Sequence, residues 1–392
     1  MKEPGAKNIR ALPPYLFSKL NKRKQELREI GVDIIDLGIG DPDLPTPDFI
    51  KNRLISELNE TDNMRYSTFN GCFEFREAVA DFYKKYYDVE LDPETEILTL
   101  IGSKEGIAHL IQAMVDPEDV VLVPDPSYPV YSMATHIAGA GLYGMNMPES
   151  NGFRPDFESI PSEILKKAKL AFLNYPGNPT GATVDLNFFE ESVGFFKKHG
   201  IWLAHDSAYN LVTFGDYKAP SVMQVTGAKE TAVEFGSLSK GFNMTGWRIG
   251  YIVGNAKIIN LLKTLKSNLD SSQFLPIQKA AAAALKSDLT LLKERNAVYE
   301  KRADVMIRAL RDVGIAVSKP RGSIFLWARV PGGETSAAFC EKVMLNTGVI
   351  ITPGTAFGEG GEGYFRISLS VPDERLMEAA NRIREAMNEK IE

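Results

Sequence analysis

Short apolar segments alternate with longer amphipathic ones between about residues 96 and 254. The segments "EILTLIGS", "DVVLVPDP" and "AKLAFLN" have the length and composition of buried strands. Each is followed by a segment with helical spacing of its apolar residues, such as "KEGIAHLIQAMV" or "NFFEESVGFFKKHG". Strands that alternate with helices of about 10–15 residues are typical of a mostly parallel sheet. We therefore predict an α/β domain with helices on both faces of such a sheet.

The pattern changes after Gly254, where three helical segments follow one another and the last spans 289–314. We predict strands in "IAVSKP", "SIFLWARV", "GVIITPG" and "YFRISLS", which alternate with helices in "SAAFCEKVMLNTG" and "DERLMEAANRIREAMNEK". This is the pattern of a second, smaller α/β layer, and it places a domain boundary near 275–300.

Composition and charge narrow the class of protein. The 392 residues carry 45 Lys+Arg and 51 Asp+Glu, a net charge of −6, which argues against a nucleic-acid partner. We find no apolar window long enough to span a membrane, and the first residues lack the apolar core of a signal peptide. Cys72 and Cys340 do not make a disulfide framework, so we expect reduced thiols. These features predict a soluble, cytoplasmic protein.

Several catalytic motifs are absent or misplaced. "GEGGEG" (358–363) matches a dinucleotide fingerprint in letters but precedes a strand instead of following one. There is no P-loop, and the histidines do not stand at metal-ligand spacing, so no metal is expected. Ser237 and Lys240 match the S-x-x-K of serine acyl transfer, but the S-D-N and K-T-G partners of that motif are missing.

Lys240 is instead a candidate nucleophile, in the segment "SLSKGFNMTGWRIGY". A lysine amine forms Schiff bases with aldehydes when its surroundings lower its pKa or hold it against the carbonyl. Lys240 ends a strand between small residues, which leaves room for a planar partner. Ser237, Ser239 and Arg248 offer the hydroxyl donors and the cation that a phosphate on such a partner needs.

Other strand ends supply the remaining groups of a site for pyridoxal phosphate. Asp206 in "LAHDSAY" ends an apolar strand and can keep a pyridine nitrogen protonated. Tyr209 and Asn174 can hydrogen-bond the ring's phenolic oxygen, and Tyr128 can stack on the ring. The turn before the helix at Ser103 and Lys104 favours a phosphate.

Arg366 in "YFRISLS" completes the set, because its planar fork suits a carboxylate. Each of these residues alone also fits a structural role, as a turn residue, a half-buried aromatic or a surface ion pair. Together they provide every group that pyridoxal phosphate chemistry requires.

Nearly the whole chain resembles the fold-type I, class I and II pyridoxal-phosphate aminotransferases. "NYPGNPTG", "HDSAY", "SLSKGFNMTGWRIGY" and "FRISLS" match motifs of this family in the family's order. The resemblance implies that Lys240 forms the internal aldimine and serves as the acid and base of a ping-pong amino transfer. It implies cofactor contacts from a set of ten further residues: Ser103, Lys104, Tyr128, Asn174, Asp206, Tyr209, Ser237, Ser239, Arg248 and, from a partner chain, Tyr66.

The resemblance also implies the architecture and the assembly. Residues 1–45 would form an N-terminal arm and part of the small domain, 46–285 the large domain with a seven-stranded sheet, and 286–392 the small C-terminal domain. Because Tyr66 would reach the phosphate of the neighbouring chain, the resemblance implies a homodimer with shared active sites.

Within the family, the segments "PPYLF", "LGIGDPDLPTP" and "LIGSKEGIAHL" are most similar to the LL-diaminopimelate aminotransferases of lysine biosynthesis. Substrate contacts would come from Tyr15, Gly40, Lys104, Asn174 and Arg366, and the substrates would be an amino acid and a 2-oxo acid. Some members carry a glutamate shortly after the tyrosine of the "Y-x-x-x-x-G" segment, where it can receive the substrate's distal ammonium. Here that stretch reads Ser-Thr-Phe-Asn, 67–70.

Three alternatives stay open at this point. The same machinery could act on aspartate, an aromatic amino acid or a 2-oxo acid of the methionine cycle. The same cofactor could serve a C–S lyase or a decarboxylase. The chain could also be a non-catalytic binding module that keeps an aminotransferase-like domain.

Overall fold

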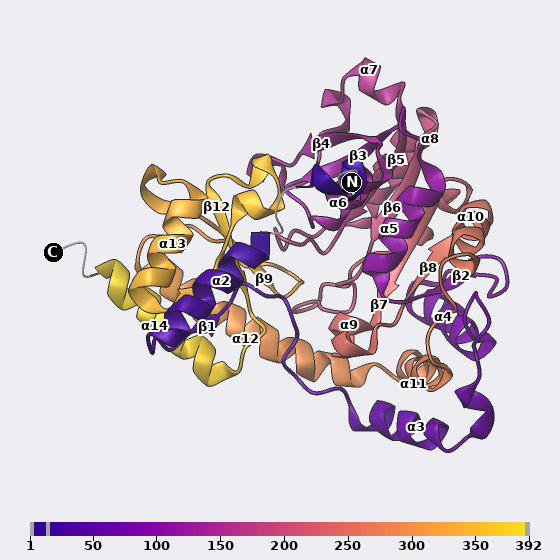
Figure 1. Cartoon of the computed structure of the whole chain (residues 1–392), viewed down its shortest axis with the longest axis horizontal. Helices are drawn as coiled ribbons and strands as arrows, with labels where there is room; N and C mark the ends of the chain where they lie inside the picture. The colour runs from indigo at the N-terminus through magenta and orange to yellow at the C-terminus, as the bar shows by residue number, and fades with distance from the viewer. Residues whose placement is uncertain (1–3, 13–15, 389–392) are drawn as a thin grey trace.

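The computed structural model describes residues 4–12 and 16–388. A large sheet with its helices occupies one part of the molecule and a smaller α/β unit the other (Figure 1). The long helix α12 (Thr290–Asp312) leads from the first part to the second. Within the described residues, no helix is long and apolar enough to cross a membrane.

The large sheet has seven strands in the order β2-β8-β7-β6-β5-β3-β4. Their bounds are β2 Ile97–Leu100, β8 Gly250–Gly254, β7 Ala232–Ser237, β6 Trp202–Asp206, β5 Ala168–Asn174, β3 Val120–Asp125 and β4 Gly141–Asn146. The strand β8 runs antiparallel to both of its neighbours, and the other strands run parallel to one another. The prediction of a mostly parallel, seven-stranded sheet is confirmed.

Two hydrophobic cores lie on opposite faces of this sheet. One face packs against α5 (Ser103–Met114), α6 (Val130–Ala138) and α10 (Ala256–Ser267). The other packs against α4 (Phe73–Tyr87), α8 (Leu186–Lys198) and α11 (Leu275–Lys286), with α3 (Asp48–Leu58) outside them. Successive strand residues point to opposite faces, so Leu203 of β6 joins the α8 side and Ala204 the α5 side. This alternation decides which way the polar residues at the strand ends point.

The small unit has a three-stranded antiparallel sheet, β11-β12-β9, and a parallel pair, β1-β10. Its strands are β1 Ile35–Asp36, β9 Phe325–Arg329, β10 Val349–Ile350, β11 Thr352–Pro353 and β12 Tyr364–Ser368. Its helices are α2 Leu16–Glu29, α13 Ser336–Thr347 and α14 Asp373–Asn388. The unit thus combines α2 and β1 from the N-terminal part of the chain with the C-terminal elements, whereas α1 (Lys7–Arg10) lies against α6 of the large domain.

Shorter helical turns connect these elements. The short α-helices are α1 Lys7–Arg10, α7 Ser162–Leu165 and α9 Leu238–Gly241. The 3₁₀ turns are η1 Thr61–Met64, η2 Glu149–Asn151, η3 Phe157–Ser159, η4 Val222–Gln224, η5 Ala228–Glu230, η6 Thr245–Trp247, η7 Pro331–Gly333, η8 Gly354–Phe357 and η9 Glu359–Gly361.

Two strand predictions for the small unit need correction. The segment "IAVSKP" is not a strand, because it pairs only at an isolated bridge between Val317 and Ala328. Its last residue, Pro320, has no amide hydrogen for a ladder. "GVIITPG" is divided between β10 and β11, which belong to different sheets.

The chain leaves the small core between Leu37 and Ile50 and returns to it inside α12, between Leu292 and Tyr299. Between these crossings the segment after β6 also joins the small core, through Tyr209, Val212 and Phe214. The division at 45 and 285 stays a prediction.

Candidate active site

A cavity of about 400 Å³ opens at the carboxyl ends of β5, β6 and β7. Open α/β sheets bind ligands at this edge, and the volume is that of a small-molecule site. Twelve of the residues singled out in the sequence line it: Gly40, Ser103, Lys104, Tyr128, Asn174, Asp206, Tyr209, Ser237, Ser239, Lys240, Arg248 and Arg366. The structure therefore brings together segments that lie more than 300 positions apart in the chain.

Lys240 lies in the short helix α9, directly after β7. The Ser237 hydroxyl caps this helix by accepting a hydrogen bond of 3.2 Å from the Ser239 amide. The Lys240 Nζ donates a hydrogen bond of 2.8 Å to the Gly40 carbonyl. Burial lowers the pKa of the Lys240 amine to about 8, although the nearby Asp41 charge opposes this shift. This shift leaves a larger neutral fraction of the amine at physiological pH than an exposed lysine has, and the neutral amine is the nucleophile.

Asp206 ends β6 and is buried on the face that α5 and α6 cover. Its Oδ2 accepts a hydrogen bond of 2.7 Å from the Tyr131 hydroxyl. Burial raises the pKa of the Asp206 carboxyl, and this hydrogen bond and the charge of neighbouring His205 lower it. Sequence reasoning missed Tyr131. The signal was its position three residues after Tyr128 at the start of a helix, which brings both rings to one face, 6.1 Å apart at 88°.

Asn174 and Arg366 are connected through a residue that sequence reasoning also missed, Asn178. The Asn174 Nδ2 donates to the Asp206 carbonyl at 2.8 Å, and its Oδ1 accepts from the Asn178 amide at 2.8 Å. The Asn178 side chain in turn accepts a hydrogen bond of 2.8 Å from Arg366 Nη1. This chain joins the large domain to the arginine of the small one.

The aromatic rings of Phe325 and Phe357 fix the plane of the Arg366 guanidinium. Its central carbon lies 4.1 Å from the Phe325 ring centre and 4.6 Å from that of Phe357. Arg366 Nη2 also donates to the Gly38 carbonyl at 2.5 Å. An arginine held in this way presents a fixed planar fork, which is suited to a carboxylate.

Arg248 lies against Gly102 at the start of α5. Gly102 has a φ of +82°, a backbone conformation that favours glycine, and a Cβ there would lie 2.3 Å from Arg248 Nη2 and displace the guanidinium. Arg248 itself has a φ of 55° and donates from Nη1 to the Thr245 carbonyl at 2.7 Å. The guanidinium, the helix N-terminus at Ser103 and the Ser237 and Ser239 hydroxyls make this end of the cavity a site for a phosphate.

Three further residues complete the walls. The Lys104 Nζ lies 6.0 Å from the centre of the Tyr128 ring, and the Lys240 Nζ lies 5.8 Å from that of Tyr209. Tyr209 is buried, and burial raises the pKa of its hydroxyl, which therefore stays a donor.

Two of the predicted residues are not in this cavity. Tyr66 is 91% exposed and does not line it, as expected for a side chain assigned to a partner's site. Tyr15 lies outside the described residues, so its assignment stays a prediction.

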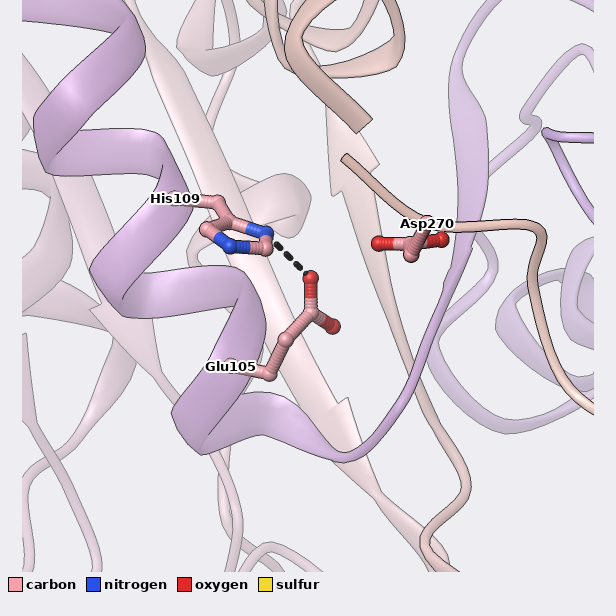
Figure 2. A group of neighbouring side chains, drawn as sticks. All are labelled: Glu105, His109 and Asp270. Carbon is pink, nitrogen blue, oxygen red and sulfur yellow. Dashed lines mark ion pairs between the residues drawn. The ribbon is translucent and has the colours of Figure 1, made fainter. Parts of the chain in front are cut away.

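A separate group of possible metal ligands lies behind the first turns of α5. Glu105, His109 and Asp270 have ligand atoms close together, and His109 Nδ1 lies 2.5 Å from Glu105 Oε1 (Figure 2). The buried Lys266 Nζ lies 2.8 Å from both Glu105 Oε1 and Asp270 Oδ2. The lysine ammonium thus already supplies the cation between these two carboxylates.

Comparisons with known proteins agree on one family. The family model described as aminotransferase class I and II matches residues 32–383. An LL-diaminopimelate aminotransferase of Moorella thermoacetica is 49% identical over 382 residues, 97% of this chain and 98% of the relative. One of Aquifex aeolicus is 48% identical over 96% of this chain and 97% of the relative. Substrate-bound BacF from Bacillus subtilis superposes with a TM-score of 0.94 at 38% identity, covering 98% of both chains.

Proposed function

We propose that this chain, which belongs to the class I and II aminotransferase family, transfers an amino group from LL-2,6-diaminopimelate to 2-oxoglutarate. Enzymes of this family use pyridoxal phosphate. The observation that carries the proposal is the cavity in which Lys240, Asp206, Arg248 and Arg366 meet. The substrate rests on the relatives named LL-diaminopimelate aminotransferase.

The residues of the cavity fit the cofactor. The close approach of Arg248 to Gly102 leaves a cradle of donors that suits a phosphate. Ser103, Ser237 and Ser239 would bind that phosphate with Arg248, and Lys104 stands beside them. Asp206 would pair with the ring nitrogen, Asn174 and Tyr209 with the phenolic oxygen, and Tyr128 would cover the ring.

When bound, pyridoxal phosphate supplies an aldehyde that condenses with amines and a ring that accepts the electron pair left by the departing α-proton. Lys240 Nζ would hold the cofactor through that aldehyde until an amino acid takes its place. The released amine would then remove the substrate's α-proton as general base and return it as general acid. Its pKa of about 8 suits both directions of proton transfer.

Arg366 would bind the substrate's α-carboxylate and set its orientation. The Phe325 and Phe357 rings and the Asn178 amide fix the guanidinium. The Asn174 side chain and the backbone at Gly40 would assist, since both lie in the same cavity. With the carboxylate held here, the α-carbon would lie toward Lys240.

Two charged residues that line the cavity have no assigned role so far: the cation Lys104 and the carboxylate Asp41. Diaminopimelate carries a second carboxylate and a second ammonium at its far end. We assign Lys104, with Tyr15, to that carboxylate. Within the described residues no hydrogen bond or ion pair engages the Asp41 side chain. Segment 67–70 contains no acidic residue that could bind the substrate's distal ammonium, so we assign Asp41 to this ammonium.

A panel of amino donors with 2-oxoglutarate tests the substrate. We expect kcat/KM to be highest for LL-diaminopimelate among this substrate, its meso isomer, aspartate, glutamine, methionine and phenylalanine. Asp41→Asn should lower kcat/KM for LL-diaminopimelate more than for phenylalanine, which lacks the second ammonium. A wild-type preference for another donor would refute the substrate assignment and leave the aminotransferase reaction intact.

We also propose a cytoplasmic homodimer with shared active sites. The exposed Tyr66 ring supports the dimer, because a side chain 91% exposed on one chain is free to enter another. The cytoplasmic location rests on Cys72 and Cys340, which are both unpaired thiols.

Mixing two inactive or weakened chains tests the shared site. A Tyr66→Phe chain and a Lys240→Ala chain, unfolded and refolded together, should regain activity above the sum of the separate proteins. If Tyr66 serves the partner, the mixed dimer contains one site with both native residues and one with neither. If Tyr66 serves its own chain, every site in the mixture keeps a defect, and no gain appears. Each variant refolded alone is the control.

A further inference from the structure

A fully buried acid-base pair lies behind Asp206, on the opposite face of β6. His205 and Glu234 are each 0% exposed and face each other across the β6–β7 pairing. The His205 Nδ1 lies 2.8 Å from Glu234 Oε2, and its Nε2 lies 3.0 Å from the Tyr175 carbonyl oxygen. The side chains of this pair have no role in the site described above.

The partners of the pair determine where its proton lies. A carbonyl oxygen only accepts, so His205 Nε2 must donate to Tyr175. Glu234 already accepts from the Tyr83 hydroxyl at 2.6 Å, the Ser221 hydroxyl at 2.7 Å and the Val222 amide at 2.9 Å. Three such donors stabilise the ionised form of a carboxyl group, and an ionised Glu234 accepts a hydrogen bond from His205 Nδ1. In that state both ring nitrogens of His205 carry a hydrogen.

Within the described residues, His205 is the only basic side chain at ion-pair distance from Glu234. From α4 the Tyr83 hydroxyl faces the carboxylate, and from β8 the Tyr251 ring packs against Tyr83 at 6.1 Å. From α8 the Phe189 ring packs on the imidazole at 4.6 Å. The charged group nearest along the chain is Asp206, whose pKa the His205 charge lowers against the effect of burial.

We propose that His205 and Glu234 form a buried imidazolium–carboxylate pair that keeps Asp206 ionised, which makes His205 a positioning residue for the cofactor's ring nitrogen. This rests on the proposed role of Asp206. A buried carboxylate needs fixed compensation to stay charged. Tyr131 supplies a hydrogen bond from the α6 side. His205, the positive end of the pair, is the chain neighbour of Asp206 in β6, whereas Glu234 lies one strand away in β7. The pair therefore favours a charged Asp206 although its own two charges sum to zero.

The protonation of His205 can be measured directly. The chain has four histidines, at 109, 136, 199 and 205, so the ¹⁵N signals of histidine-labelled holoenzyme can be assigned by removing His109, His136 and His199 in turn with glutamine. At a pH of about 8.5, well above the ordinary histidine pKa, His205 should show two protonated nitrogens. A neutral His205 signal at that pH would overturn the proposal, whatever the role of Asp206.

The influence on Asp206 is tested with the double variant His205→Gln, Glu234→Gln, which removes both charges and keeps polar groups at both positions. Apoenzyme is titrated with pyridoxal phosphate and with its 1-carba analogue, whose ring has C–H in place of nitrogen. We expect the affinity for pyridoxal phosphate to fall by about tenfold and the affinity for the analogue to be unchanged. An equal loss for both ligands would mean that the pair only supports the fold, and the proposal would be wrong.

Asp206→Asn is the matched variant in the same titration. If Asp206 pairs with the ring nitrogen, this variant should also lose affinity for pyridoxal phosphate alone. If it weakens both ligands equally, the assignment of Asp206 fails, while the histidine spectrum still decides the state of the pair. If the double variant does not fold, the spectrum of the wild-type holoenzyme remains the deciding measurement.

Discussion

Replacing Lys240 with alanine is expected to lower the turnover of amino transfer by about 10⁴-fold or more. The amine has two tasks, because it holds the cofactor and then moves the substrate's α-proton. Lys104 is the only other lysine among the described residues that line the cavity, and its Nζ lies beside the Tyr128 ring, 6.0 Å from the ring centre. Turnover is measured with saturating amino donor and 2-oxoglutarate, and a small primary amine such as methylamine should restore part of the rate.

The covalent attachment gives an independent control for the same residue. Borohydride reduction of the yellow wild-type protein should leave a pyridoxyl mass on the peptide that contains Lys240, and the Lys240→Ala protein should not gain it. Because the pKa of Lys240 is lowered to about 8, the rate at which apoenzyme captures the cofactor should rise about tenfold per pH unit below pH 8 and level off above it. A label on Lys104 would show that the wrong lysine was assigned.

Much of the cavity could be predicted because its residues follow strands. Asn174, Asp206 and Lys240 each come at or directly after the end of a short apolar segment, and parallel strands bring such ends to one edge. The sheet itself follows from the alternation of strand and helix patterns. The order of the strands and the reversed direction of β8 do not, since both depend on long-range pairing.

The site residues that the sequence did not predict make side-chain contacts with segments far away in the chain. In the sequence, Tyr131 fits an apolar position of a helix. Only the packing of α6 on the sheet brings its hydroxyl within hydrogen-bond distance of Asp206. In the sequence, Asn178 fits a turn position. Its hydrogen bond with Arg366 depends on the position of the small domain. His205 was considered only as a possible metal ligand, and its partner Glu234 lies on the next strand, 29 positions away. Such contacts depend on which strand face a side chain occupies and on what packs there.

The small domain was predicted less well for a related reason. Its strands are short, and their edges are made by segments from both ends of the chain, as in the pairing of β1 with β10. Periodicity over two to five residues cannot distinguish a strand from an extended loop. The segment "IAVSKP" alternates buried and exposed residues as a strand does, yet it forms only a single bridge.

Replacing Asp206 with asparagine is expected to preserve the fold and lower kcat by about a hundredfold or more. The asparagine amide can still accept from the Tyr131 hydroxyl through its oxygen, so the contact of 2.7 Å has a substitute. It carries no charge, however, and cannot hold a proton on a ring nitrogen. Loss of one charge-assisted contact of this kind costs about 3–4 kcal/mol of transition-state stabilisation.

The matched control for this variant is Asp125→Asn, at the end of strand β3, which is separated from β6 by β5. Asp125 does not line the cavity, and burial raises the pKa of its carboxyl, as it does for Asp206. Its Oδ1 accepts a hydrogen bond of 3.0 Å from the Gly360 amide, which an asparagine oxygen can also accept. Both variants should unfold at similar temperatures, and only Asp206→Asn should lose turnover. Near-normal turnover in Asp206→Asn would mean that another group protonates the ring, and equal losses in both variants would trace the effect to the sheet edge instead of the cofactor.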